Sequence, residues 1–127
     1  MFAGLVVALL FSDAFAGGLV LSQGDILFNY APWSAHAPAG FTRPGNLLLG
    51  DIPQVFYPFL QHTAQALRSG ALPLWATGLF AGHPYLASFQ SATFSPFTLP
   101  ALVLPTADAL LVAVIAKLLV GTRPIRT

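Results

Sequence analysis

The sequence predicts a mainly α-helical membrane protein, in which two hydrophobic segments flank a long irregular loop. Three observations predict this fold class. Hydrophobic residues make up 56% of the 127 residues and charged residues only 7%, whereas soluble domains carry about 25% charged residues. The mean hydropathy is +0.75. Eleven prolines and eleven glycines argue against a plain bundle of uninterrupted helices.

The same composition excludes several classes of protein. Disordered chains are polar and poor in aromatic residues, which this chain is not. A net charge of +1 provides no clustered basic surface for nucleic acid, so we expect no nucleic-acid partner. Because the chain has no cysteine, it has no disulfide, thiolate metal site or cysteine nucleophile.

The first hydrophobic segment runs from Phe2 to Leu21, long enough for a helix across a bilayer core of about 30 Å. We therefore expect a transmembrane helix within residues 1–22. Asp13 lies near its middle, where a carboxylate costs about 3 kcal/mol that the apolar residues must offset. This carboxylate either has a functional role or packs against a neighbouring transmembrane helix. Alternatively, Ala14-Phe15-Ala16 resembles a signal-peptide cleavage site, and cleavage there predicts a secreted lipid-binding domain.

Residues 23–97 form the predicted loop, which we expect on the extracytoplasmic side of the membrane. Glycine and proline recur every few residues and interrupt regular structure. Tyr30 and Trp33 are typical of the aromatic belt at a membrane interface. Residues 71–96 contain no charged residue, so we expect them to lie against protein or membrane.

One helix is predicted inside the loop, over about residues 53–69. Asp51 is a candidate N-cap, Pro53 suits the first turn, and Gly70 suits the C-terminal end. Pro58 either kinks this helix or marks a later start. Its apolar residues recur at spacings of three and four, so the helix is amphipathic. It lies either in the membrane interface or against a small domain.

The second hydrophobic segment spans residues 98–121, and a helix is predicted from Thr106 to Gly121. Thr106 is a candidate N-cap, and Asp108 lies in the first turn, where the helix dipole favours a carboxylate. A helix of this length covers roughly 22 Å, which is less than a bilayer core. We interpret it as a truncated transmembrane helix.

Basic residues predict the orientation of the chain. Lys117, Arg123 and Arg126 gather near the C-terminus, and the positive-inside rule then places residues 122–127 in the cytoplasm. The prediction is a multi-pass membrane protein with the lipid bilayer and other transmembrane helices as partners.

Most residues that could be catalytic or bind a metal do not match the sequence pattern of a known catalytic or metal site. His36, His62 and His83 are far apart and have no metal-binding spacing, so we predict no metal site from them. The serines of the loop lack the strand–turn–helix setting of a nucleophile elbow.

The carboxylates are better candidates. Asp25 and Asp51 are the only acids in the predicted loop. A carboxylate at a membrane interface can act as a general base, or as a ligand of a divalent metal, in a reaction on a lipid-linked substrate. No cofactor is otherwise required. The alternative for Asp51 is helix capping.

An ordered set of short motifs lies between Gly24 and Lys117: Gly24-Asp25-Ile26-Leu27-Phe28-Asn29-Tyr30-Ala31-Pro32-Trp33, Asn46 followed by Asp51-x-x-Gln54-x-x-Tyr57-Pro58, Gly70-x-Leu72-Pro73-Leu74-Trp75, Gly82-x-Pro84, and Gln90-Ser91-Ala92-x-Phe94-x-Pro96. In this order the motifs resemble the N-terminal region of the bacterial YfhO-like membrane proteins. Those proteins are similar to GT-C-type glycosyltransferases.

The resemblance implies a bacterial inner-membrane protein that uses a polyprenyl-phosphate-linked sugar. It implies that Asp51 is the candidate catalytic residue of the extracytoplasmic loop, with Asp25 as the second candidate. Gln54, Tyr57 and Gln90 are then neighbours that shape the substrate site.

Two departures separate the chain from this family. The family has Asn-Pro where Ala76-Thr77 stands here, and its members continue into many further helices. We therefore expect an N-terminal piece that is inactive alone. The alternative is a non-catalytic small membrane protein with a structural or interaction role.

Overall fold

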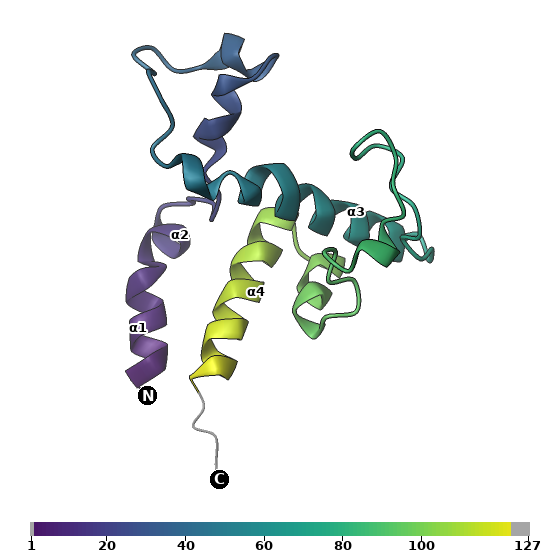
Figure 1. Ribbon diagram of the computed structural model, residues 1–127. Coiled ribbons are helices and arrows are strands. Elements are labelled where there is room, and N and C mark those ends of the chain that lie inside the picture. The colour runs from purple at the N-terminus through teal and green to yellow at the C-terminus, as the bar shows by residue number, and fades with distance from the viewer. Residues whose placement is uncertain (1, 123–127) are drawn as a thin grey trace.

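The computed structural model describes residues 2–122, and these residues are mainly helical (Figure 1). Its α-helices are α1 (Phe2–Leu10), α2 (Ser12–Ala16), α3 (Tyr57–Arg68) and α4 (Thr106–Gly121). The shorter elements are a π-helix, η4 (Ile52–Phe56), and the 3-10 helices η1 (Gly24–Asn29), η2 (Trp33–His36), η3 (Leu47–Leu49), η5 (Leu86–Ser88) and η6 (Pro96–Leu102). The predicted mainly α character is confirmed.

The predicted transmembrane helix within residues 1–22 is wrong. The hydroxyl of Ser12 donates to the carbonyl of Leu9 at 3.0 Å, a side-chain bond that competes with the regular backbone pattern, and α1 ends at Leu10. The helical direction continues through α2, but the chain leaves it at Gly17 and Gly18, where the φ of Gly18 is +63°. From Phe2 to Ala16 the two helices extend for roughly 22 Å at about 1.5 Å per residue.

The predicted second transmembrane helix is wrong as well. Helix α4 has the expected bounds, Thr106–Gly121, with Asp108 in its first turn, but the N-cap position belongs to Pro105 and not to Thr106, and no side chain caps the helix. It extends for roughly 24 Å, against about 30 Å for a bilayer core. Within residues 2–122, no helix combines the length and the apolar character needed to cross a membrane. Of the predicted cytoplasmic tail, residues 123–127 lie outside the described residues.

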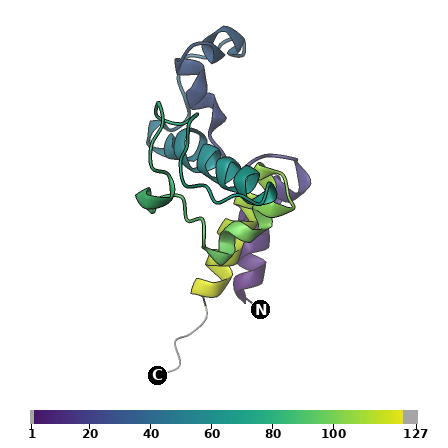
Figure 2. The ribbon, with the colours of Figure 1, turned by 90° about the vertical axis from the view of Figure 1, so that its right-hand side faces the viewer.

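Helices α1 and α4 lie side by side and run in opposite directions (Figures 1 and 2). Together with α2 we call them the apolar helix pair. Large apolar side chains cover much of its outer surface and are exposed: Leu5, Leu9, Leu10, Phe15, Val112, Leu118, Leu119 and Val120. Apolar patches of this kind are typical of surfaces that contact lipid or another protein.

The helix predicted over 53–69 is present as η4 followed by α3. Pro58 lies at the start of α3, so it marks the beginning of the α-helix and does not kink it. The end of α3 depends on Gly70, which has a φ of +76°. There the N–H of Gly70 donates to the carbonyl of Leu67 at 3.0 Å, and the N–H of Ala71 donates to the carbonyl of Ala66 at 2.9 Å. These two bonds form a Schellman motif, in which glycine tolerates the positive φ.

The best-buried part of the molecule lies between α3 and the loop that follows it. We call this part the Tyr85 core, and it consists of Phe59, Thr63, Ala76 and Tyr85, none of which is more than 3% exposed. The Tyr85 hydroxyl donates to the carbonyl of Phe59 at 2.6 Å and lies 2.8 Å from the hydroxyl of Thr63. Burial raises the pKa of Tyr85, while the hydrogen bond to Thr63 lowers it; the pKa rises on balance.

Arg68 joins the last turn of α3 to the end of η6. Its guanidinium donates to the carbonyls of Leu102 at 3.0 Å, Ala101 at 2.6 Å and Leu104 at 2.9 Å. Carbonyls at a helix end have no helical partner, and a guanidinium can satisfy several of them at once. One side chain therefore fixes α3 against the segment that leads into α4.

Residues 24–50 form a separate lobe, which extends from the N-terminal end of α3 away from the apolar helix pair (Figures 1 and 2). We call it the N-terminal lobe. Its irregular chain is held by a carboxylate–amide hydrogen bond between Asp25 and Gly45. The rings of Phe28 and Phe41 add an edge-to-face contact with centroids 5.3 Å apart.

Candidate functional site

Asp25 has a structural position in the N-terminal lobe. Its Oδ2 accepts a hydrogen bond from the backbone N–H of Gly45 at 2.7 Å and so closes the lobe across 20 residues of sequence. Its other oxygen, Oδ1, is buried and has no partner among the described residues. We infer that Asp25 positions the lobe and that its remaining oxygen can still accept one hydrogen bond.

Asp51 occupies the N-cap position of η4, but its side chain makes no capping hydrogen bond. The residue is exposed. The carboxylate of Asp51 therefore does not cap the helix, which was the alternative role considered from the sequence. An exposed carboxylate with no intramolecular partner is available to a substrate or a proton.

Close packing brings the two acids to the same junction. A Cβ atom at Gly50 would lie only 2.7 Å from Cδ1 of Ile26, so the tip of the Ile26 side chain packs directly against the backbone just before η4. Ile26 follows Asp25, and Gly50 precedes Asp51. The lobe and the start of η4 are therefore in contact at residues adjacent to both acids.

A cavity of about 480 Å³ opens beside this junction, lined by Leu27, Tyr30, Trp33, Pro53, Gln54 and Pro58. We call it the aromatic pocket. Tyr30 and Trp33 are 51% and 48% exposed, so each ring offers a face to a ligand. Asp51 lies three residues before Gln54 in the chain, and the N–H of Gln54 donates to the carbonyl of Gly50 at 3.1 Å.

The remaining predicted site residues do not line this pocket. Tyr57 is half-buried at the start of α3. Gln90 lines a different cavity of about 360 Å³ between α3, α4 and the loop before η6. Of the predicted site residues, only Gln54 lines the aromatic pocket, Asp51 and Asp25 are near it only along the chain, and Gln90 lines a second cavity.

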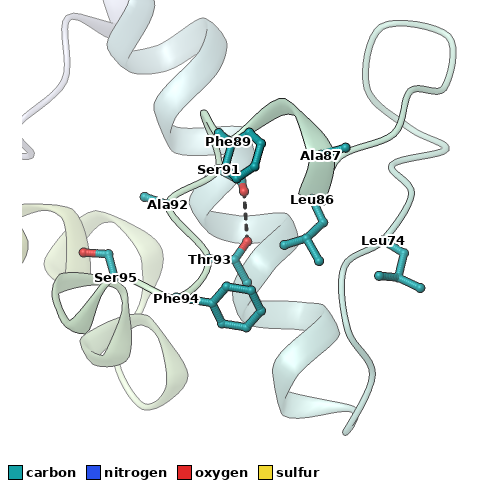
Figure 3. Close-up of a pocket in the computed structure, with 9 residues that line it drawn as sticks. All are labelled: Leu74, Leu86, Ala87, Phe89, Ser91, Ala92, Thr93, Phe94 and Ser95. Carbon is teal, nitrogen blue, oxygen red and sulfur yellow. Dashed lines mark hydrogen bonds between the residues drawn. The ribbon is translucent and has the colours of Figure 1, made fainter.

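A third cavity, of about 590 Å³, lies in the loop after α3 and has mostly apolar walls (Figure 3). It is lined by Leu74, Leu86, Ala87, Phe89, Ser91, Ala92, Thr93, Phe94 and Ser95. The hydroxyls of Ser91 and Thr93 are buried and lie 2.9 Å apart, and Figure 3 shows this hydrogen bond in the cavity wall.

The histidines do not form a metal centre. Within residues 2–122, no group of three histidine or acidic side chains is close enough to hold a metal ion. His62 and His83 instead lie beside Tyr85, with ring centroids 4.7 and 5.9 Å from its ring. Sequence spacing did not indicate this aromatic cluster because its members come from two segments about 20 residues apart.

No family model, curated protein or solved structure matches this chain. The candidate site is therefore argued from its own residues.

Proposed function

We propose that this chain belongs to a membrane-associated, GT-C-like glycosyl-transfer protein of the bacterial plasma membrane, and that it binds the sugar of a polyprenyl-phosphate-linked donor. In this proposal the N-terminal lobe faces the extracytoplasmic side. The observation that carries the proposal is the aromatic pocket itself, with the exposed and uncapped Asp51 two residues before Pro53 of its lining. The motifs that resemble YfhO-like proteins support the same substrate.

The lining of the aromatic pocket suits a sugar ring. Sugars present flat C–H faces, which pack on aromatic rings, and hydroxyls, which need donors and acceptors. Tyr30 and Trp33 supply exposed ring faces, and the amide of Gln54 supplies both a donor and an acceptor. A volume of about 480 Å³ lies within the usual range for small-molecule sites.

Asp51 is placed to act as the general base in transfer. The carboxylate accepts the proton of the acceptor hydroxyl as that oxygen forms a bond to the anomeric carbon of the sugar. The bond from that carbon to the phosphate oxygen breaks, and polyprenyl phosphate leaves with the electron pair. Asp25 holds the lobe and does not take part in the proton transfer. A divalent metal bound at Asp51 is the alternative role for this carboxylate.

A first experiment tests donor binding. The probe is a short-chain polyprenyl-phosphate-linked glucose, titrated in detergent micelles against the fluorescence of Trp33 in a Trp75→Phe background. We expect saturable quenching, and about tenfold weaker binding for Gln54→Ala because one good hydrogen bond is lost. No saturable quenching in the parent chain would refute the proposal.

A second experiment tests Asp51. Slow hydrolysis of the donor, with water in place of the acceptor, is measured with and without added Mg²⁺. We expect Asp51→Asn to lower the rate by about 100-fold or more while donor binding is unchanged. Asp108→Asn, which removes an exposed acid from α4, is the matched control and keeps the parent rate. Equal rates for the two variants contradict the assigned role.

The second candidate function is a non-catalytic one, structural or in the binding of another protein, at the membrane. The exposed side chains of the apolar helix pair favour it because they need a partner whether or not the chain is an enzyme. A chain that floats with phosphatidylcholine vesicles but binds no donor supports this alternative.

A further inference from the structure

Two of the cavities adjoin each other along the loop before η6. The cavity of about 360 Å³ between α3 and α4 and the cavity of about 590 Å³ in the loop share Ser91, Ala92 and Ser95. We call the combined space the Ser91 groove. Phe56 and Leu60 of α3 and Leu110 and Val114 of α4 line its inner part, so its walls are mostly apolar along both cavities.

One positively charged side chain lines this groove. Lys117 lines the inner cavity, and its Nζ lies 5.7 Å from the ring centroid of Phe97. It follows Ala109 and Ala113 at spacings of eight and four on α4, and both alanines are buried. Residues at these spacings share one helix face, but Lys117 itself is exposed, so it lies where this face of α4 reaches the surface at the edge of the cavity.

Within residues 2–122, no acidic side chain shares these cavities with Lys117. No carboxylate is among the residues that line either cavity. Asp108, the acid of α4, lines a small separate cavity with Leu19 and Val20. A lysine ammonium beside apolar walls is stabilised by an anion, so the groove combines an apolar channel with a single point of positive charge.

We propose that the Ser91 groove binds an anionic phospholipid of the bilayer, with one acyl chain along the apolar walls and the phosphate at Lys117. Charge complementarity selects this occupant, because the phosphate of an anionic lipid is free to pair with the ammonium, whereas choline neutralises the phosphate of a zwitterionic lipid within its own headgroup and an apolar peptide has no anionic group. Gln90, Ser95 and Thr98 line the same inner cavity and offer hydrogen bonds to the headgroup. The groove is distinct from the aromatic pocket and from Asp51, so this inference goes beyond the proposed function.

Native mass spectrometry of the detergent-solubilised chain tests the proposal. The probes are lysophosphatidylglycerol and lysophosphatidylcholine of the same chain length, which differ only in the headgroup. We expect one lysophosphatidylglycerol to be retained, with lysophosphatidylcholine bound about tenfold more weakly, because its choline ammonium competes with Lys117 for the phosphate.

Variants of Lys117 locate the binding. Lys117→Gln should weaken lysophosphatidylglycerol binding about tenfold, and Lys117→Arg should retain it because the charge remains. Arg43→Gln, which removes an exposed cation of the N-terminal lobe, is the matched control and should bind like the parent. Circular dichroism confirms that each variant is folded.

Three results overturn the proposal: equal binding of the two probes, parental affinity in Lys117→Gln, or the same loss in Arg43→Gln. The quenching of Trp33 fluorescence by the polyprenyl-linked donor separates the lipid site from the donor site. Lys117→Gln should leave that quenching unchanged. If the parent chain binds lysophosphatidylglycerol but shows no donor binding, the proposed function is refuted and the lipid site is not.

Discussion

The two parts of the molecule that meet α3 are built in opposite ways. The Tyr85 core is sealed: Thr63 and Tyr85 have no exposed surface, and their hydroxyls are paired with each other and with the backbone. The N-terminal lobe is open, with Tyr30 and Trp33 about half exposed. Burial of this kind provides stability, whereas exposed aromatic rings on an irregular chain are typical of binding sites. The side chains that stabilise the fold and the aromatic rings that are open to a ligand therefore lie in different parts of the chain.

The largest expected effect is on the Tyr85 core. Phe59→Ala removes a ring that is 3% exposed and that contacts Tyr85 with centroids 5.1 Å apart. We expect the free energy of unfolding to fall by about 3–5 kcal/mol, because the lost contacts leave a cavity. Urea unfolding in detergent, followed by circular dichroism, measures this change.

Trp33→Ala in the lobe is the matched control. Its ring is half exposed, so we expect a loss of no more than about 1 kcal/mol. Similar losses in Phe59→Ala and Trp33→Ala would break the comparison, because the lobe would then contribute as much stability as the core.

The next effect concerns Arg68, which fixes the core side of α3 to η6. Arg68→Met keeps most of the aliphatic chain and removes the donors to three carbonyls. Since the side chain is exposed, water can replace part of this bonding, and we expect a loss of about 1–2 kcal/mol. Arg43→Met, in the lobe, should change the unfolding free energy by less than about 0.5 kcal/mol. If Arg43→Met lowers the unfolding free energy more than Arg68→Met does, the lobe contributes more stability than the contact between α3 and η6.

Local signals in the sequence predicted much of α3 and α4. Pro53 and Gly70 mark the limits of the helix over 53–69, and Asp108 lies in the first turn of α4 as expected. These features depend on neighbouring residues and backbone geometry, which a single sequence contains. The break after Leu10 was missed because summed hydrophobicity does not record the bond from the Ser12 hydroxyl to the Leu9 carbonyl.

The arrangement of the sites was not predictable in the same way. Arg68 bonds to carbonyls 33 to 36 residues away, and nothing in the local pattern indicates such a contact. Gln54 was grouped with Asp51 only by the family resemblance, and of the two only Gln54 lines the aromatic pocket. Gln90 was grouped with them only by motif order, whereas the chain carries it into the Ser91 groove.

A smaller effect is expected on the pH dependence of stability, which should come from the Tyr85 core and not from the lobe. Because burial raises the pKa of Tyr85, the folded protein holds this proton more tightly than the unfolded chain. Stability from this group is therefore complete below pH 10, the ordinary pKa of tyrosine, and is lost as the pH rises through the higher pKa of the folded state.

Unfolding at pH 8 and at pH 11 should show this loss in the parent, and Tyr85→Phe should lack that part of it. Tyr30→Phe, which removes an exposed hydroxyl from the lobe, should retain the parental pH dependence. If Tyr30→Phe abolishes the dependence instead, the titrating group lies in the lobe and the sealed core has no part in it.

The smallest change in global stability is expected from Asp25→Asn, because this variant acts inside the lobe. The carboxylate Oδ2 accepts from the N–H of Gly45 at 2.7 Å, and an amide oxygen in its place is a weaker acceptor than a charged one. Unfolding followed at the Tyr85 core should change by less than about 0.5 kcal/mol. Hydrogen exchange at the Gly45 amide should accelerate about five- to tenfold, since a local opening that costs about 1 kcal/mol less is populated more often. The same amide should be unaffected in Arg68→Met. If Asp25→Asn lowers global stability as much as Arg68→Met does, the lobe and the core unfold as one cooperative unit and the separation between them is lost.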